Sequence, residues 1–165
     1  MRVYADTSWW LSYKCRLDSK HSAAIRLFDR EDEFDLLWTP WQRVEVFNAL
    51  CQAERGGLLA KGESRQVIRL LEQEVRLGYW PHVEFDWTDA VRTAGELRAE
   101  HSLRMVVRGM DLFHVAIAIE VAAEAILSFD TDQCNLAKAA GLDVLSPAQG
   151  PTSYPANRAN CTASA

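Results

Sequence analysis

Four carboxylates stand where apolar segments end, or inside segments that are apolar over most of their circumference. Asp6 follows the apolar stretch RVYA, Asp130 follows AILSF, and Asp111 begins the most apolar helical segment. Glu45 lies within WQRVEVFNALCQ, with no lysine or arginine three or four residues away. A carboxylate in a mostly buried helix is costly unless it is paired or bound to a metal. These four acids are the first candidates for a functional site.

Mutual repulsion decides what must accompany four carboxylates if they converge. Two unit charges about 4 Å apart repel by roughly 4 kcal/mol at an effective dielectric near 20, so the group needs a cation. Carboxylate-rich, all-oxygen sites suit Mg²⁺ or Mn²⁺. One such ion lowers the pKa of an attacking water, and a second ion would stabilise a leaving oxygen. The expected reaction is phosphodiester hydrolysis.

The elements that would position these acids alternate between short apolar strands and longer amphipathic helices. We expect strands at residues 2–5, 35–39, 82–85, 125–129 and 143–145, and helices at 8–17, 21–30, 41–55, 64–77, 88–101, 111–124 and 136–141. This alternation predicts an α/β fold with a parallel sheet and helices on both faces. Ligands bind outside the carboxyl ends of such strands, where Asp6, Asp130 and Asp132 would emerge together. Thr7 or Ser8 is expected to cap the first helix, which would leave Asp6 free.

Composition indicates one domain. The chain has 165 residues, of which 48% are hydrophobic and 25% charged, and we expect a single domain over residues 1–147 and a disordered tail over 148–165. The most apolar stretch, residues 112–127, contains His114, Glu120 and Glu124, so it predicts a buried helix and not a membrane span. No secretory signal is recognised, and we expect a cytoplasmic protein. The four scattered cysteines fit neither a zinc site nor a disulfide framework.

The net charge of −5 excludes a protein that binds nucleic acid through charge alone. Action on a polyanion would need a bound cation or a local basic group. Arg108, just before Asp111, is a candidate for contacting a phosphate, although a solvated surface arginine is the alternative. His114 shares a helix face with Asp111. It could orient a phosphate or carry a proton, and a buried core histidine is the alternative.

The residues also resemble a known family. DTS at Asp6, Glu45 in RVEVFNAL, DLFHVAIA from Asp111, and SFDTDQCNLAKAAGL with Asp130 resemble the PIN domain in order and spacing over about residues 1–147, in particular the VapC-like toxins of type II toxin-antitoxin pairs. The resemblance implies a three-layer α/β/α sandwich around a mainly parallel sheet. It also implies a Mg²⁺- or Mn²⁺-dependent ribonuclease that forms a homodimer and is inhibited by a small antitoxin whose peptide occupies the active-site groove.

Site roles follow from the same resemblance. Asp6, Glu45, Asp111 and Asp130 would bind the metal and carry catalysis, and Asp132 would be an accessory ligand. The second acid in FDTD leaves open whether Asp130 or Asp132 makes the direct contact. The hydroxyl of Thr7 or Ser8 would be a further accessory ligand. Apart from the resemblance, the candidates for contacting substrate are Thr7, Ser8 and Arg108.

Three other interpretations stay open from the sequence. A receiver-like signalling module also has an acidic pocket, but the stretch VLSPAQ lacks the lysine it needs after its last strand. A haloacid-dehalogenase-like phosphatase carries a strand followed by DxD, but SFDTD comes too late in this chain. A PIN-like scaffold that binds RNA without cutting it would keep the fold and lose the chemistry.

Overall fold

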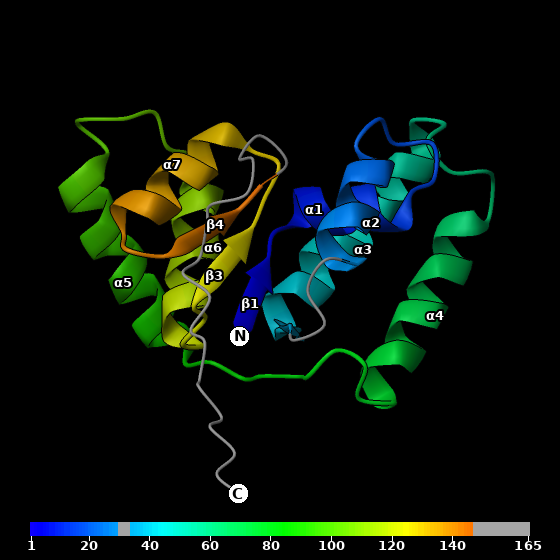
Figure 1. Ribbon diagram of the computed structural model, residues 1–165, viewed down its shortest axis with the longest axis horizontal. Coiled ribbons are helices and arrows are strands. Elements are labelled where there is room, and N and C mark those ends of the chain that lie inside the picture. Colours follow the sequence, from blue (N-terminus) through cyan, green and yellow to red (C-terminus); the bar gives the residue numbers. More distant parts are fainter. Residues whose placement is uncertain (30–33, 147–165) are drawn as a thin grey trace, which may run out of the picture.

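Four parallel strands form a single sheet in the order β2-β1-β3-β4 in the computed structural model, which describes residues 1–29 and 34–146 (Figure 1). The strands are β1 (Arg2–Ala5), β2 (Asp35–Leu37), β3 (Ala125–Leu127) and β4 (Asp143–Leu145). In the register, Val3 pairs with Leu36 on one side and with Ala125 on the other. The carboxyl ends of the two central strands, β1 and β3, therefore lie side by side, and the N–H of Asp6 donates to the carbonyl of Leu127 at 3.0 Å.

Seven helices in the described ranges cover the two faces of the sheet. They are α1 (Thr7–Lys14), α2 (His21–Asp29), α3 (Pro40–Arg55), α4 (Glu63–Arg76), α5 (Trp87–His101), α6 (Gly109–Glu120) and α7 (Thr131–Ala139). Helices α1 to α4 pack on one face, and α5 to α7 pack on the other (Figure 1). The expected three-layer α/β/α sandwich is confirmed.

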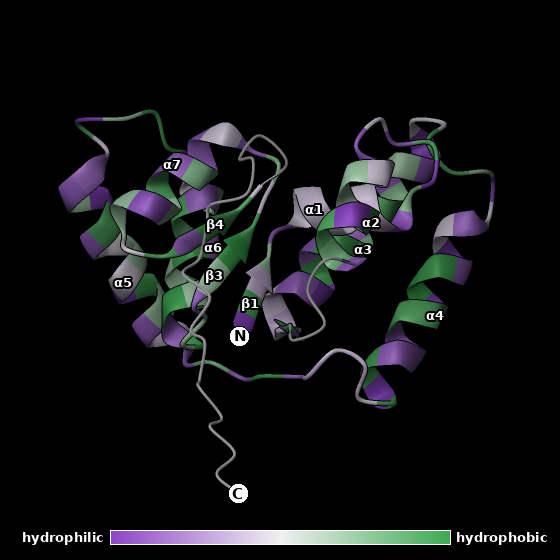
Figure 2. Ribbon diagram, viewed as in Figure 1, coloured by the Kyte–Doolittle hydropathy of each residue, from purple (hydrophilic) through white to green (hydrophobic). Residues whose placement is uncertain are grey.

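Side-chain alternation along β1 divides the interior into two cores. Val3 and Ala5 point to the core under α1 to α4, whereas Tyr4 points to the core under α5 to α7. Both sides of the sheet are thus buried, which explains the continuous apolar strand segments. In Figure 2, β3 is hydrophobic, while α4 and α5 alternate between hydrophobic and hydrophilic residues along their length.

Several elements differ from the boundaries expected from sequence. The predicted strand over 82–85 contributes only an isolated bridge, between His82 and Trp38. The strand predicted to reach residue 39 ends at Leu37, because Thr39 caps α3. Helix α7 begins at Thr131, five residues before the expected start at 136, because Asp130 caps it. The boundaries of these elements are therefore set by tertiary and capping contacts, and not by the secondary-structure propensity of the local sequence.

Within residues 1–29 and 34–146, no helix combines the length and apolarity that crossing a membrane requires. The tail expected over 148–165 lies outside the described residues.

Candidate functional site

Asp6 stands at the junction between β1 and α1, and the structure buries it. It is 2% exposed and accepts hydrogen bonds from the N–H of Trp9 (2.9 Å), the hydroxyl of Ser8 (2.8 Å) and the hydroxyl of Ser128 (2.7 Å). The expectation that Thr7 or Ser8 would cap α1 is wrong, since Asp6 itself is the N-cap. Burial raises the pKa of Asp6, while His114 and the hydrogen bonds act in the opposite direction.

Ser128 connects Asp6 to Asp130. Its hydroxyl donates to Asp6 and accepts from the N–H of Asp130 at 3.0 Å, so one side chain joins the residues that follow β1 and β3. Asp130 also caps α7, because its Oδ1 accepts from the N–H of Asp132 at 2.9 Å. Among the contacts of the described residues, Asp132 contributes this backbone N–H and no carboxylate bond.

Arg108 connects Asp130 to Asp111. Asp111 lies in the first turn of α6, is 6% exposed, and accepts a hydrogen bond from the backbone N–H of Arg108 at 2.9 Å. The guanidinium of Arg108 extends to Asp130 Oδ2 at 3.3 Å, with 68% of the side chain exposed. Arg108 is therefore a solvent-accessible cation beside two of the four acids.

Glu45 reaches the same region from α3. Its Oε2 accepts hydrogen bonds from the hydroxyl of Thr7 and from Nε2 of His114, the latter at 2.6 Å. Burial alone would raise the pKa of Glu45, but the hydrogen bond and charge of His114, with the bond from Thr7, bring it below its usual value. Glu45 is thus held as an ionised carboxylate beside Thr7, the residue that follows Asp6.

His114 is a buried histidine with a partner on each ring nitrogen. Nδ1 lies 2.8 Å from the hydroxyl of Tyr4, and the histidine is 3% exposed. This burial agrees with the interpretation as a core histidine and removes the ring from contact with a phosphate in solution. Tyr4 is fully buried; its burial, with the charges of Glu45 and Asp6, raises its pKa well above the usual value.

Gln42 fixes the start of α3 against β1, a role that the sequence analysis missed. Its Oε1 accepts from the N–H of Thr39 at 2.7 Å, and its Nε2 donates to the carbonyl of Ala5 at 2.6 Å. The threonine followed three residues later by glutamine is a capping-box signature, which could have indicated the first of these bonds. The view of α3 as mostly buried is wrong, since Val44 is 62% exposed and Cys51 is also exposed.

Shared neighbours connect the four carboxylates, which we call the acid set: Asp6, Glu45, Asp111 and Asp130. Ser128 joins Asp6 to Asp130, Arg108 joins Asp130 to Asp111, and Thr7 joins Glu45 to the end of β1. Each acid is bonded to a protein donor. Within residues 1–29 and 34–146, no three histidine, cysteine, aspartate or glutamate side chains lie close enough to hold one metal ion. The all-oxygen donor set has the chemistry of a Mg²⁺ or Mn²⁺ site, and side-chain rotation would be needed to direct it at one point.

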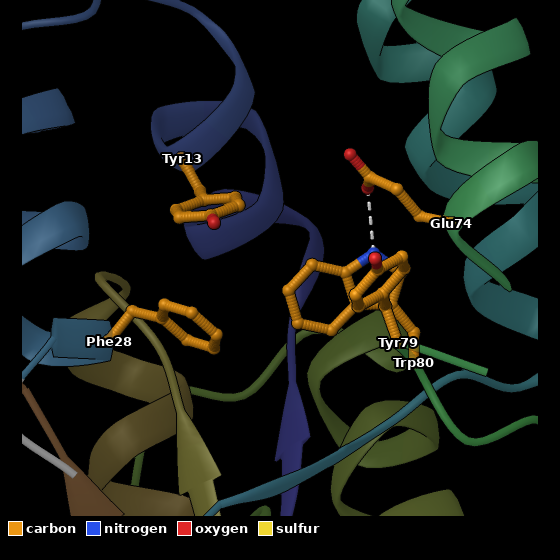
Figure 3. A pocket seen from close by; sticks show the side chains of 5 residues that line it. All are labelled: Tyr13, Phe28, Glu74, Tyr79 and Trp80. Carbon is orange, nitrogen blue, oxygen red and sulfur yellow. Dashed lines mark hydrogen bonds between the residues drawn. The ribbon is translucent and has the colours of Figure 1, made fainter. Parts of the chain in front are cut away.

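A separate cavity lies between α1, α2 and the end of α4 (Figure 3). It measures about 300 Å³ and is lined by Tyr13, Phe28, Glu74, Tyr79 and Trp80. The indole N–H of Trp80 donates to Glu74 at 2.7 Å, as Figure 3 shows. Lys14 pairs with the same carboxylate oxygen at 2.6 Å. No member of the acid set lines this cavity.

The fold and the acid set define an α/β/α domain with acidic residues gathered at the carboxyl edge of a parallel sheet. The family model of the PIN domain matches residues 3–139. The chain therefore belongs to the PIN domain family.

Solved structures share this fold at low sequence identity. VapC20 of Mycobacterium tuberculosis, described as a sarcin-ricin loop cleaving toxin, is 17% identical, with a TM-score of 0.60 over 85% of this chain and 95% of that chain. VapBC2 of Rickettsia felis, bound to a promoter DNA fragment, is 12% identical, with a TM-score of 0.61 over 88% and 98%. FitAcB of Neisseria gonorrhoeae is 14% identical, with a TM-score of 0.59 over 88% and 97%. No curated protein matches the sequence significantly.

Proposed function

We propose that this protein is a Mg²⁺- or Mn²⁺-dependent endoribonuclease and the toxin of a toxin-antitoxin pair. The observation that carries the proposal is the acid set, in which four carboxylates from four different elements are linked at the carboxyl edge of the sheet. Membership of the PIN domain family supports it.

In this proposal Asp6, Glu45, Asp111 and Asp130 hold the metal. When bound, a divalent ion supplies an activated water and stabilises charge on the leaving oxygen. Asp130 is favoured over Asp132 as the direct ligand because its carboxylate, and not that of Asp132, takes part in the described network. Thr7 and Ser8 act through the acids, since their hydroxyls donate to Glu45 and Asp6.

Arg108 is the residue we assign to the RNA backbone. The chain carries a net charge of −5, so a phosphate approaching the acid set needs a local cation. The guanidinium of Arg108 is largely exposed and lies beside Asp130. A guanidinium binds phosphate oxygens through directed hydrogen bonds, and it can leave Asp130 for a substrate phosphate.

The proposed partners are an RNA substrate, a small antitoxin and a second copy of the chain. The Mycobacterium tuberculosis protein is described as a toxin that cleaves the sarcin-ricin loop, which supports an RNA substrate. The Rickettsia felis structure holds VapBC2 on a DNA fragment from its promoter, and the resemblance of this chain to VapC-like toxins supports an antitoxin partner. Exposed apolar side chains on α5 and α6, namely Trp87, Val91 and Met110, support a homodimer, which sedimentation of the purified protein would test.

Cleavage by purified protein freed of any antitoxin tests the enzymatic proposal. RNA should be cut with Mg²⁺ or Mn²⁺ and stay intact in EDTA. Asp111→Asn should be folded and inactive, because an amide keeps the bond to Arg108 N–H but loses the charge. Asp89→Asn is the matched control, an acid in the first turn of α5 outside the acid set. Cleavage in EDTA, or full activity of Asp111→Asn, contradicts the proposal.

The toxin role has its own test. Expression in a bacterial host should arrest growth, and co-expression of a short adjacent reading frame should relieve the arrest. An active ribonuclease that leaves growth unaffected would keep the enzymatic proposal and remove the toxin role. A folded protein that binds RNA without cutting it would identify the scaffold alternative.

A further inference from the structure

We propose that His114 is a positioning residue, which holds the Glu45 carboxylate in place for the cation and is itself held by Tyr4. This inference rests on the proposed metal-dependent function. It concerns a chain of hydrogen bonds that starts in the central strand β1, passes through α6 and ends on α3. The three residues lie in three different elements. The two hydrogen bonds therefore fix the Glu45 side chain, on α3, relative to the central strand β1.

The direction of the bonds follows from what each group can donate. An ionised carboxylate only accepts hydrogen bonds, so Nε2 of His114 must carry the hydrogen in its 2.6 Å contact with Glu45. Nδ1 lies 2.8 Å from the hydroxyl of Tyr4, which donates to Nδ1 of a neutral ring and accepts from Nδ1–H of a charged one. In either state, Tyr4 holds the ring so that Nε2 is directed at Glu45. Metal-binding sites commonly use such outer partners to orient a ligand.

The contacts on Glu45 also select which of its oxygens is available. His114 and Thr7 both donate to Oε2, and neither engages Oε1. Oε1 would therefore be the oxygen left to bind a cation. A glutamate side chain has three torsions and loses conformational entropy when a metal orders it. Two donors on Oε2 already order Glu45, which reduces the entropy that metal binding costs.

A purely structural role does not account for this arrangement. His114 lies in an α6 segment whose buried residues are otherwise mostly apolar, among them Leu112, Val115 and Ala116. Burying a polar ring there is costly unless both nitrogens are bonded, and a leucine would fill a similar volume without that requirement. The bond that satisfies Nε2 goes to a member of the acid set, so the ring serves the site as well as the core.

Mn²⁺ affinity of the purified protein, measured by titration calorimetry without RNA, tests the inference. His114→Leu should bind Mn²⁺ about 10–100-fold more weakly, the usual loss when an outer-shell partner is removed. His114→Gln can still donate an amide hydrogen toward Glu45 and should stay close to wild type. Tyr4→Phe should fall between the two. Tyr13→Phe, a tyrosine in the separate cavity, is the matched control and should bind as the wild type does.

Activity provides a second measurement that packing alone would not change. In His114→Leu, kcat at low Mn²⁺ should fall and recover as Mn²⁺ rises, with the KM for RNA unchanged. A residue with only a packing role would lower the free energy of unfolding and leave the Mn²⁺ affinity of the folded protein as it was. If His114→Leu does not fold, Tyr4→Phe carries the test, and wild-type affinity in that variant overturns the inference.

The outcomes separate this inference from the proposed function. Wild-type protein that neither binds Mn²⁺ nor cleaves RNA overturns both. Wild-type protein that does both, with a His114→Leu variant of equal Mn²⁺ affinity, or with His114→Gln as weak as His114→Leu, overturns the positioning role of His114 alone.

Discussion

The hydroxyl of Ser128 donates to the carboxylate of Asp6 at 2.7 Å, and these two residues are 122 positions apart in the sequence. The same hydroxyl accepts from the N–H of Asp130 at 3.0 Å. Ser128 is fully buried, so bulk water cannot take the place of its hydroxyl in either hydrogen bond. One hydroxyl thus fixes the spacing of two acids at the ends of adjacent parallel strands.

Ser128→Ala should lower the free energy of unfolding by about 1.5–3 kcal/mol, because a buried carboxylate loses a charge-assisted hydrogen bond. Urea unfolding followed by circular dichroism gives this value. RNA cleavage should fall as well, because Asp6 and Asp130 lose the shared hydrogen-bond partner that holds them at a fixed spacing. Ser22→Ala, at an exposed position of α2, should change neither quantity. Equal stability of the two variants would contradict the bridging role.

Gln42→Ala should destabilise the protein by about 1–3 kcal/mol, because the buried carbonyl of Ala5 and the N–H of Thr39 lose their partners. The measurement is again urea unfolding, with Gln66→Ala on the exposed face of α4 as the control. A stability loss no larger than that of Gln66→Ala would show that solvent replaces the amide of Gln42.

Three members of the acid set, Asp6, Asp111 and Asp130, carry local signals in the sequence, whereas Glu45, inside α3, does not. An acid directly after an apolar strand, or in the first turn of an apolar helix, is visible in a short window, and parallel strands bring such positions to one edge. The residues that hold the acids carry no such signal. Tyr4 and His114 are 110 positions apart, and their bond exists only once α6 packs on the sheet. Gln42 likewise depends on the approach of α3 to β1.

Cysteine reactivity should report the burial of α1. Burial raises the pKa of the Cys15 thiol to about 11, with the nearby carboxylates of Asp18 and Glu63 acting in the same direction. At pH 8 this thiol stays protonated and unreactive, because the thiolate is the nucleophile. Iodoacetamide should modify the exposed Cys51 and spare Cys15 in the native protein, and modify both in guanidinium, as peptide mass mapping would show. Equal native labelling of the two would contradict the burial of Cys15.

Arg108→Ala should weaken RNA binding without unfolding the protein, because its side chain is largely exposed and its backbone N–H, which bonds Asp111, remains. If the guanidinium neutralises one phosphate, the slope of log affinity against log salt should shrink by about one. Fluorescence anisotropy with a labelled RNA, in EDTA to prevent cleavage, measures the slope from low to moderate salt. The matched control is Arg98→Ala, which removes an exposed arginine of a different helix, α5. An unchanged slope for Arg108→Ala, or an equal change in the control, would remove Arg108 from the proposed substrate contact and leave it as the partner of Asp130.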